Sequence, residues 1–376
     1  MGEPLAQGIR PAASQPPLTL RGLDCTLVEV PLRRVLGTSA ATVRSAPLLL
    51  VELQTEEGVT GYSYVFCYRR SGGRSIAHVL GDIAELVKGQ RLAPLAQAAL
   101  LQRRFALLGV TGVVRMALSA FDMASWDALA VAAGLPLARL LGAEPRPVRA
   151  YNSCGLGLME PQAAADEALA LLDGGFEAVK LRLGYATLAQ DLAVTRAVRA
   201  VLPDPVQLLV DYNQALSRAE ALARGRALQG EGVAWLEEPI RHDDLAGNAE
   251  IARSLELPLQ IGENFDGPKD LLRALQAGAC DLVMPDVARI GGVSGWMQAA
   301  GVAEAHGVPM SSHLMPEASA HLLAATPTGH WLEYVDWTDA IATDPVRIRD
   351  GCWPLDDRPG TGLSWDPGKV AACRVA

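Results

Sequence analysis

The sequence predicts an α/β protein in which a barrel of parallel strands follows a smaller α+β domain. Three carboxylates at an even interval predict the barrel. Asp211, Glu237 and Glu263 are evenly spaced (positions 211, 237 and 263), and each ends a short apolar run. One strand–loop–helix–loop unit of an eight-fold α/β barrel takes roughly 30 residues, because about 250 residues are shared among eight units. The interval therefore fits one carboxylate for each barrel unit.

The same pattern continues on both sides of the three carboxylates. Lys180 and Arg182 end the run FEAVKLRLG upstream. Downstream, three further runs end in Asp286, His313 and Glu333. Helical stretches separate these runs, for example residues 188–202, 216–229 and 294–307. Alternating strands and helices predict a parallel sheet. Seven units that each end in a polar residue predict a closed (β/α)8-type barrel, in the form (β/α)7β, with its site at the C-terminal face.

The segments around the barrel differ in pattern. Strand-like runs joined by turn-forming residues, then a long helical tract, predict an α+β cap over residues 21–142. The barrel is expected over residues 143–348, which the chain enters through the linker GAEPRPV. Residues 1–20, rich in Pro, Ala, Gln and Gly, are predicted to be a disordered tail. Residues 349–376 are predicted to pack back on the cap.

Composition excludes several classes of partner. The net charge is −9 and no basic stripe interleaves with aromatic residues, so no nucleic-acid partner is expected. No apolar run reaches the length of a membrane span, so no membrane partner is expected. The six cysteines include no C-x-x-C pair, which favours reduced thiols in a cytoplasmic protein over disulfides or a zinc site.

Carboxylates at the ends of successive strands are expected to converge on a metal. Hard oxygen ligands suit Mg²⁺, and no His or Cys joins Asp211, Glu237 and Glu263 to favour zinc. Each acid taken alone also fits a surface carboxylate or a helix N-cap. Their equal spacing favours the metal site.

Four further strand ends carry candidates for catalysis. The chain has 33 basic residues but only four lysines, so Lys180 inside an apolar run is unusual; it is expected to neutralise a substrate carboxylate rather than reach solvent. Asp286 and His313 end consecutive strands, and a carboxylate that orients a histidine makes it a better base. Glu333 is expected to stay protonated and donate to an oxyanion, with a helix-capping role as the alternative.

Several sequence motifs, taken in their order along the chain, resemble those of the mandelate racemase branch of the enolase superfamily. They include VKLRLG, LVDYNQ, WLEEP, IGENF, MPDVARIGGVSGW and PMSSHLMPE, and the resemblance spans nearly all of residues 22–365. The established chemistry of that superfamily uses a Lys or His base, with Mg²⁺ stabilising an enediolate. The resemblance implies this chemistry here.

The resemblance also implies roles for individual residues. The acids Asp211, Glu237 and Glu263 would bind Mg²⁺, and His313 with Asp286 would form an acid–base dyad. Lys180 and Glu333 would contact the substrate carboxylate from different sides. Asn213 and Ser153 match polar pocket positions, and residues 34–47 match a mobile lid. Family members are often symmetric homo-oligomers, so an assembly such as an octamer is expected.

One position departs from the family pattern. The family usually has Lys-x-Lys, whose second lysine is a base opposite the histidine, but this chain has Arg182 there. Arginine stays protonated above roughly pH 12 and is a poor base at neutral pH. The prediction is therefore a Mg²⁺-dependent enzyme that removes the α-proton of a small 2-hydroxycarboxylate and then eliminates water, as an acid-sugar hydro-lyase does.

Two alternatives stay open. A racemase or epimerase of a 2-hydroxy acid such as mandelate is the first, and apolar residues beside the catalytic strand ends support it: Leu314, Met315 and Val335. Small and polar residues in the lid favour a polar substrate instead: Gly37, Thr38, Ser39 and Thr42. An inactive barrel with a binding role is the second alternative, and only Arg182 supports it.

Overall fold

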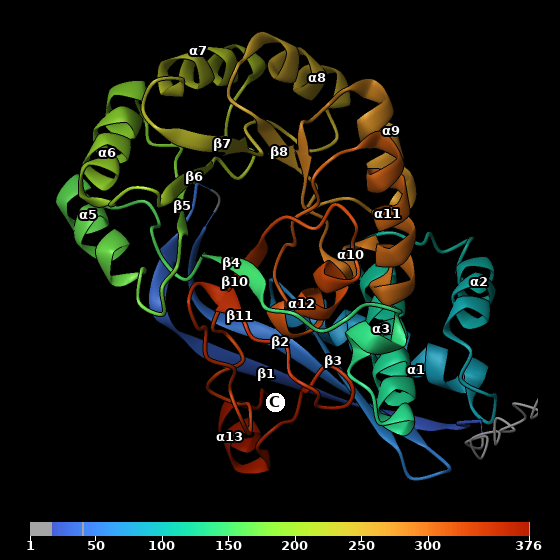
Figure 1. Ribbon diagram of the computed structural model, residues 1–376. Coiled ribbons are helices and arrows are strands. Elements are labelled where there is room, and N and C mark those ends of the chain that lie inside the picture. Colours follow the sequence, from blue (N-terminus) through green and yellow to red (C-terminus); the bar gives the residue numbers. More distant parts are fainter. Residues whose placement is uncertain (1–16, 40, 376) are drawn as a thin grey trace, which may run out of the picture.

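The computed structural model describes residues 17–39 and 41–375 (Figure 1). Most of the predicted tail, residues 1–16, lies outside the described residues. The last part of that prediction is wrong, because Leu18 and Leu20 are buried and Leu20 begins the first strand. The backbone of Leu20 bonds to Gln90 and Gly89, which ties this segment to the cap.

The cap is an antiparallel sheet covered by helices. Its strands pair in the order β1–β2–β3: β1 (Leu20–Gly37), β2 (Thr42–Thr55) and β3 (Thr60–Phe66). Its helices are α1 (Arg70–Val87), α2 (Pro94–Arg104), α3 (Gly112–Ala133) and the short α4 (Leu137–Leu140). Helix α1 buries Ile76, Leu80, Ile83 and Val87, a spacing that forms one helical face, and it packs this face on the sheet.

Helix α3 joins the cap to the barrel. Gly61 of β3 lies so close to α3 that a Cβ atom there would stand 2.1 Å from the Ala124 carbonyl oxygen. On its other side, α3 packs against α10 (Val287–Ile290) and α11 (Gly292–His306) of the barrel. Asp122 accepts hydrogen bonds from the Ser294 amide at 2.9 Å and the Ser294 hydroxyl at 2.5 Å. These contacts fix the cap relative to the barrel mouth.

The second sheet is the parallel barrel. Its strands follow in the order β10 (Leu332–Tyr334), β4 (Val148–Asn152), β5 (Ala178–Arg182), β6 (Gln207–Asp211), β7 (Val233–Glu237), β8 (Leu259–Ile261) and β9 (Leu282–Val283). The helices on its outside, besides α10 and α11, are α5 (Pro161–Ala170), α6 (Leu188–Val201), α7 (Arg218–Leu228), α8 (Leu245–Ser254), α9 (Pro268–Ala277) and α12 (Pro316–Ala324). Figure 1 shows helices α5 to α9 and α11 as an arc around the strands.

Residues 310–313 close the barrel between β9 and β10. Met310 bridges to Val283 on one side and Gly329 on the other, and His313 bridges to Asp286. The Ser312 amide donates to the Trp331 carbonyl at 2.9 Å. Pro309, which has no amide proton, precedes this segment, so the ladder there is irregular. The predicted (β/α)7β barrel with an N-terminal α+β cap is confirmed.

Period-two alternation places the polar strand ends in the barrel interior. One layer of the interior is a cluster of Tyr151, Ala178, Leu209, Trp235 and Trp331. The residues two positions further along the same strands are Ser153, Lys180, Asp211, Glu237 and Glu333. Because side chains alternate between the two faces of a strand, these residues point inward above the apolar layer. The barrel core thus carries a polar layer at its C-terminal end.

The C-terminal segment contacts both domains. Strand β11 (Cys352–Trp353) pairs antiparallel with β4, and α13 (Pro367–Cys373) lies near β1 (Figure 1). The Val375 amide donates to the Leu27 carbonyl at 2.9 Å, and the Leu137 amide donates to the Gly360 carbonyl at 2.7 Å. In the described part of the chain, no helix is long and apolar enough to cross a bilayer.

Candidate active site

Lys180 stands at the centre of the polar layer. Its ammonium lies 2.7 Å from Glu237 Oε1, 2.8 Å from Glu333 Oε1 and 3.6 Å from Asp211 Oδ2. Burial alone would lower the pKa of Lys180, but the charges of Glu237 and Glu333 outweigh burial and hold this pKa well above its usual value. Lys180 is therefore a fixed positive charge and cannot serve as a base while these carboxylates are ionised.

Asp211 and Glu237 are neighbours because their strands pair in register. Asp211 lies opposite Glu237 in the β6–β7 ladder. Burial, together with the nearby Asp211, raises the pKa of Glu237 to about 8, although Lys180 offsets part of this effect. Two buried carboxylates this close repel each other and favour a cation between them. Lys180 supplies one positive charge there.

His313 and Asp286 form a hydrogen-bonded pair. His313 Nδ1 lies 2.7 Å from Asp286 Oδ2, and Asp286 Oδ1 accepts from the Ala288 amide at 2.7 Å as the N-cap of α10. Asp286 is thus held by backbone on one side and orients the imidazole on the other. The free nitrogen, His313 Nε2, lies 3.3 Å from Glu263 Oε2. Burial would lower the pKa of His313, but the charges of Glu263 and Glu333 raise it to about 10.

Glu333 is held in its charged form. Its Oε1 accepts from the Ser153 hydroxyl at 2.7 Å, and its Oε2 accepts from the Leu314 amide at 2.9 Å. Burial alone would raise its pKa, but Lys180 and His313 hold the pKa of Glu333 well below its usual range. The neutral, donating Glu333 expected from the sequence is not the form that these surroundings favour.

Arg182 faces the same cavity but is anchored at its guanidinium. Its Nη1 donates to the Gly155 carbonyl at 2.6 Å and to the Ser153 carbonyl at 3.2 Å. Its Nη2 donates to the Ser153 hydroxyl at 2.7 Å, while Nε has no hydrogen-bond partner among the described residues. The guanidinium therefore donates hydrogen bonds to several neutral oxygen atoms. These hydrogen bonds explain how a buried arginine is tolerated without an ion pair to a carboxylate.

The donor set suits a hard cation. Asp211, Glu237 and Glu263 supply only carboxylate oxygens, and Asn213 adds a buried side-chain oxygen with no partner among the described residues. Such oxygen donors are the ones that Mg²⁺ takes. No group of three His, Cys, Asp or Glu side chains is already gathered around one metal position in residues 17–39 and 41–375. Asp211 and Glu237 meet around Lys180, whereas Glu263 is turned toward His313.

One cavity of about 740 Å³ unites the predicted residues with residues of the cap. Lys180, Arg182, Asp211, Asn213, Glu263, His313 and Glu333 line it, and Ser153 and Asp286 bond directly to lining residues. Glu237 lies beneath Lys180. The wall also contains cap residues that were not predicted from the sequence: Glu29, Phe66, Tyr68, Arg69 and Arg70. Glu29 lies within β1 and the others belong to FCYRR at the end of β3, and neither segment carries a motif that would have singled them out.

The hairpin between β1 and β2 lies against the barrel loops. The Leu158 amide donates to the Gly37 carbonyl at 2.8 Å, and the Ser39 hydroxyl donates to the Tyr212 carbonyl at 3.0 Å. A Cβ atom on Gly157 would stand 2.4 Å from the Gly37 amide nitrogen, so only glycine fits at this contact. The hairpin therefore reaches the edge of the cavity that holds the polar layer.

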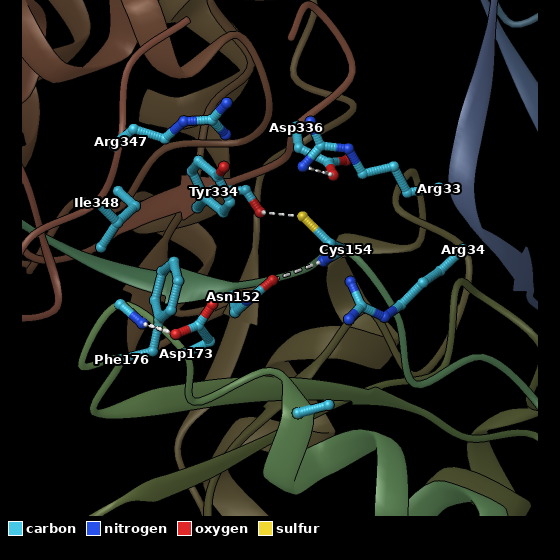
Figure 2. Close-up of a pocket in the computed structure, with 12 residues that line it drawn as sticks. Arg33, Arg34, Asn152, Cys154, Asp173, Phe176, Tyr334, Asp336, Arg347 and Ile348 are labelled. Atoms are coloured by element: carbon cyan, nitrogen blue, oxygen red, sulfur yellow. Dashed lines mark hydrogen bonds and ion pairs between the residues drawn. The ribbon is translucent and has the colours of Figure 1, made fainter. Parts of the chain in front are cut away.

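A second cavity, of about 560 Å³, lies on the outer side of the β10–β4 seam (Figure 2). Asn152 and Tyr334 line it, one residue away from the inward-facing Ser153 and Glu333. Figure 2 shows Arg33 reaching toward Asp336, with an N–O distance of 3.5 Å. This cavity is separate from the polar layer because its strand residues face away from the barrel interior.

Family models match both parts of the chain. Residues 163–369 match the model described as enolase C-terminal domain-like, and residues 23–142 match that of the mandelate racemase/muconate lactonizing enzyme N-terminal domain. The chain belongs to the mandelate racemase/muconate lactonizing enzyme family. The resemblance found in the sequence motifs is thus confirmed, and the protein is an enolase-superfamily enzyme.

Relatives in this family include solved and characterised proteins. A crystal structure of an enolase from alpha proteobacterium BAL199 with bound magnesium is 44% identical, with a TM-score of 0.93, covering 95% of this chain and 100% of that one. An enolase from Bradyrhizobium, complexed with magnesium and mandelic acid, is 39% identical, with a TM-score of 0.91, covering 96% and 99%. The L-talarate/galactarate dehydratase of Salmonella typhimurium LT2 is 30% identical over 333 residues, 88% of this chain and 83% of the relative.

Proposed function

We propose that the protein is a Mg²⁺-dependent enzyme that removes the α-proton of a small 2-hydroxycarboxylate, gives an enediolate, and then eliminates water. One observation carries the proposal. The Asp286–His313 pair, at 2.7 Å, borders the same cavity as Lys180 and Glu333. A base and a positive charge that can bind a carboxylate, here Lys180, in one cavity are what α-proton abstraction beside a carboxylate requires.

His313 carries the proton transfer in this proposal. Its Nδ1 proton is held by Asp286, so Nε2 is the nitrogen that takes the α-proton from substrate carbon 2. The C–H bond breaks, its electron pair moves toward the substrate carboxylate, and His313 becomes an imidazolium. Lys180 offers a positive charge to that carboxylate as its negative charge grows.

The same histidine can complete the elimination. The enediolate expels the hydroxyl group on carbon 3, and the His313 imidazolium returns the proton to it, so that water leaves and His313 becomes neutral again. The enol that remains rearranges to a 2-keto-3-deoxy acid. This sequence needs one acid–base residue on one face of the substrate, which matches the residues lining the cavity.

Asp211, Glu237 and Glu263 would hold the metal. When bound, Mg²⁺ supplies Lewis-acid stabilisation of the carboxylate charge that develops. Glu263 has a second effect in the absence of a cation, since its charge helps to raise the pKa of His313 to about 10. A general base works best when its pKa lies near the working pH. Neutralising Glu263 would therefore bring His313 closer to the range in which it can accept a proton.

Arg182 favours elimination over racemisation. A racemase takes and returns the proton on both faces, and so needs a second base opposite His313. Arg182 holds the matching position, but its Nη groups are bound to Ser153 and Gly155, and an arginine is a poor general base. Arg182 instead fixes the Ser153 hydroxyl, which donates to Glu333.

Racemisation of a 2-hydroxy acid such as mandelate is the second candidate. Two observations favour it. The Bradyrhizobium relative was crystallised with mandelic acid. The cavity also has an apolar wall of Leu36, Phe66, Val335 and Trp337, which suits an aryl or alkyl substituent.

Deuterium exchange distinguishes elimination of water from racemisation. Candidate acids would be incubated with enzyme and Mg²⁺ in D₂O, with the α-proton followed by NMR and the products identified. We expect exchange that His313→Asn abolishes, together with a 2-keto-3-deoxy product. Interconversion of enantiomers without loss of water would establish the racemase, and no exchange with any acid, in wild-type enzyme that binds Mg²⁺, would refute both.

We also propose three properties beyond the chemistry. The hairpin of residues 34–47 closes over bound substrate, and the protein forms a symmetric homo-oligomer such as an octamer, which light scattering would test. It works in the cytoplasm, a proposal supported by six cysteines that are all free thiols in the described residues.

A further inference from the structure

The catalytic cavity changes in character from its floor to its mouth. The floor carries the proton-transfer and carboxylate-binding residues described above. The wall above it is apolar, formed in part by Leu36, Phe66 and Trp337. At the mouth the cap contributes three arginines, Arg44, Arg69 and Arg70. A molecule filling the cavity would therefore meet the ammonium of Lys180 at the floor and guanidinium groups at the mouth.

Only one of the three mouth arginines is neutralised. Arg70 makes an ion pair with Glu29, and the Ser45 hydroxyl donates to the same carboxylate at 2.5 Å. Arg44 and Arg69, in contrast, make no side-chain hydrogen bond or ion pair to any of the described residues. Two unpaired guanidinium groups at the mouth of a substrate cavity are suited to bind an anion, because they present several donors in a fork that matches carboxylate or phosphate oxygens.

The fold brings these two arginines to one side of the mouth. Leu48 of β2 pairs with Phe66 of β3, and the Cys67 amide donates to the Pro47 carbonyl at 2.8 Å. Residues 44–47 of β2 and residues 66–69 at the end of β3 therefore lie at the same end of the cap sheet. Tyr68, with a φ of 59°, turns the chain so that Arg69 becomes the residue before α1.

We propose that the substrate is a dianion, and that Arg44 and Arg69 bind an anionic group at the end remote from the reacting carboxylate. This inference rests on the proposed function, since it takes the floor of the cavity as the reacting end. The class is a 2-hydroxy acid with a second terminal carboxylate; a terminal phosphate monoester presents the same chemistry. A cavity of about 740 Å³ accommodates a chain of several carbons between the two ends.

The first part of the test uses matched acids. α-Proton exchange in D₂O would be measured for six-carbon monoacids, for diacids of the same configuration, and for 6-phosphorylated monoacids. The expected result is a higher kcat/KM for a dianionic member of each set. The preferred dianion, carboxylate or phosphate, identifies the source of the second charge. A preference for the monoacid in every set would overturn the proposal.

The second part uses variants of the mouth. Arg44→Gln and Arg69→Gln should each lower kcat/KM for the dianion by roughly tenfold. This loss is at the low end of the range for a hydrogen bond to a charged group, because both arginine side chains are exposed to solvent. Exchange with the monoacid should stay unchanged, since that acid places no charge at the mouth. Arg44→Lys, which keeps the charge, should lose less. The exposed Arg103→Gln on α2 is the control for net charge.

Other outcomes would contradict the binding of an anionic group by Arg44 and Arg69. An equal loss for monoacid and dianion that disappears at high salt would show electrostatic steering only. If no acid exchanges its α-proton, the proposed function fails. Calorimetric binding of diacid and monoacid to Mg²⁺-loaded enzyme then tests the anion site of Arg44 and Arg69 separately. Tighter binding of the diacid that Arg69→Gln removes would uphold it, and equal binding would overturn it.

Discussion

The guanidinium of Arg182 lies 2.7 Å from the hydroxyl of Ser153, and that hydroxyl donates to Glu333 over another 2.7 Å. Arg182 thus acts on Glu333 through Ser153 rather than by facing it directly. A lysine at position 182 would offer one nitrogen in place of two, so the Ser153 hydroxyl and the Gly155 carbonyl, now bound by different nitrogens, would have to share a single donor atom.

The first prediction follows from this arrangement. Native enzyme should exchange the α-proton of only one enantiomer of a simple 2-hydroxy acid, because His313 serves one face. Arg182→Lys should create exchange with the other enantiomer, since Arg182 is buried among neutral acceptors, and burial without a carboxylate partner lowers the pKa of a lysine, whereas arginine does not lose its proton. NMR of each enantiomer in D₂O would measure this.

Arg182→Met is the matched control for that experiment. It removes the same hydrogen bonds as the lysine variant but supplies no titratable group. Any exchange seen equally in both variants would come from loosening the site and would refute the role of a second base. Equal exchange of both enantiomers by native enzyme would show that Arg182 itself works as a base, and racemisation would become the preferred function.

The second prediction concerns Asp211. Asp211→Asn should weaken Mg²⁺ binding at least tenfold and remove exchange activity, because a carboxylate ligand is replaced by a neutral amide. The free energy of unfolding should change by no more than about 1–2 kcal/mol, since the residue stands above the packed interior. Calorimetry with Mg²⁺ and urea unfolding would be compared with Asp82→Asn, an exposed acid on α1. Unchanged Mg²⁺ affinity would exclude Asp211 as a ligand.

The third prediction tests the hairpin contact at Gly157. A Cβ atom there would meet Gly37 backbone atoms at 2.4–3.0 Å, so Gly157→Ala must push the hairpin away from the barrel. The Leu158 amide, bonded to Gly37 at 2.8 Å, should then exchange faster with solvent. We expect kcat/KM to fall by roughly 10- to 100-fold if closure positions the substrate.

The control for that variant is Gly301→Ala in the exposed part of α11. No atom lies within 4 Å of a Cβ at Gly301, so this change should leave activity unaltered and favour the helix slightly. Faster exchange of the Leu158 amide in Gly157→Ala with unchanged kcat/KM would show that the hairpin contact is structural and has no part in catalysis.

Much of the site could be predicted because a strand alternates its side chains. Once Trp235 and Leu209 are assigned to the interior, Glu237 and Asp211 two residues later must face the same way. The order of the strands then brings their ends to one mouth. This reasoning needs only local periodicity and the closure of the barrel.

Other features depend on tertiary packing and left no local pattern. Arg69 and Phe66 reach the cavity because α3 docks the cap on the barrel helices, a contact between segments about 170 residues apart, such as Asp122 and Ser294. The orientation of Glu263 toward His313 is a matter of side-chain rotamers, which the spacing of residues does not encode. The sequence therefore predicts which strand residues face the site more readily than it predicts which side chains they contact.

The last prediction concerns pH and His321, which is remote from the polar layer. His321 is buried on α12, and its Nδ1 accepts from the Ala138 amide at 3.2 Å. Burial lowers its pKa from 6.5 to about 4. A folded-state pKa below the unfolded one means that the unfolded chain binds the extra proton between these values. The stability due to neutral His321 is therefore complete above pH 6.5 and is lost as pH falls toward 4.

The size of the effect follows from the shift in the pKa of His321 from 6.5 to about 4. A shift of this size corresponds to about 3 kcal/mol of unfolding free energy. Urea unfolding at pH 7 and pH 4.5 should show that wild-type protein loses most of this amount, roughly 2 kcal/mol, in excess of His321→Gln, which cannot take up a proton. His306→Gln, at the exposed end of α11, should keep the wild-type pH dependence. If His321→Gln and wild type lose stability equally, His321 is already protonated in the folded state, or its burial has no energetic consequence.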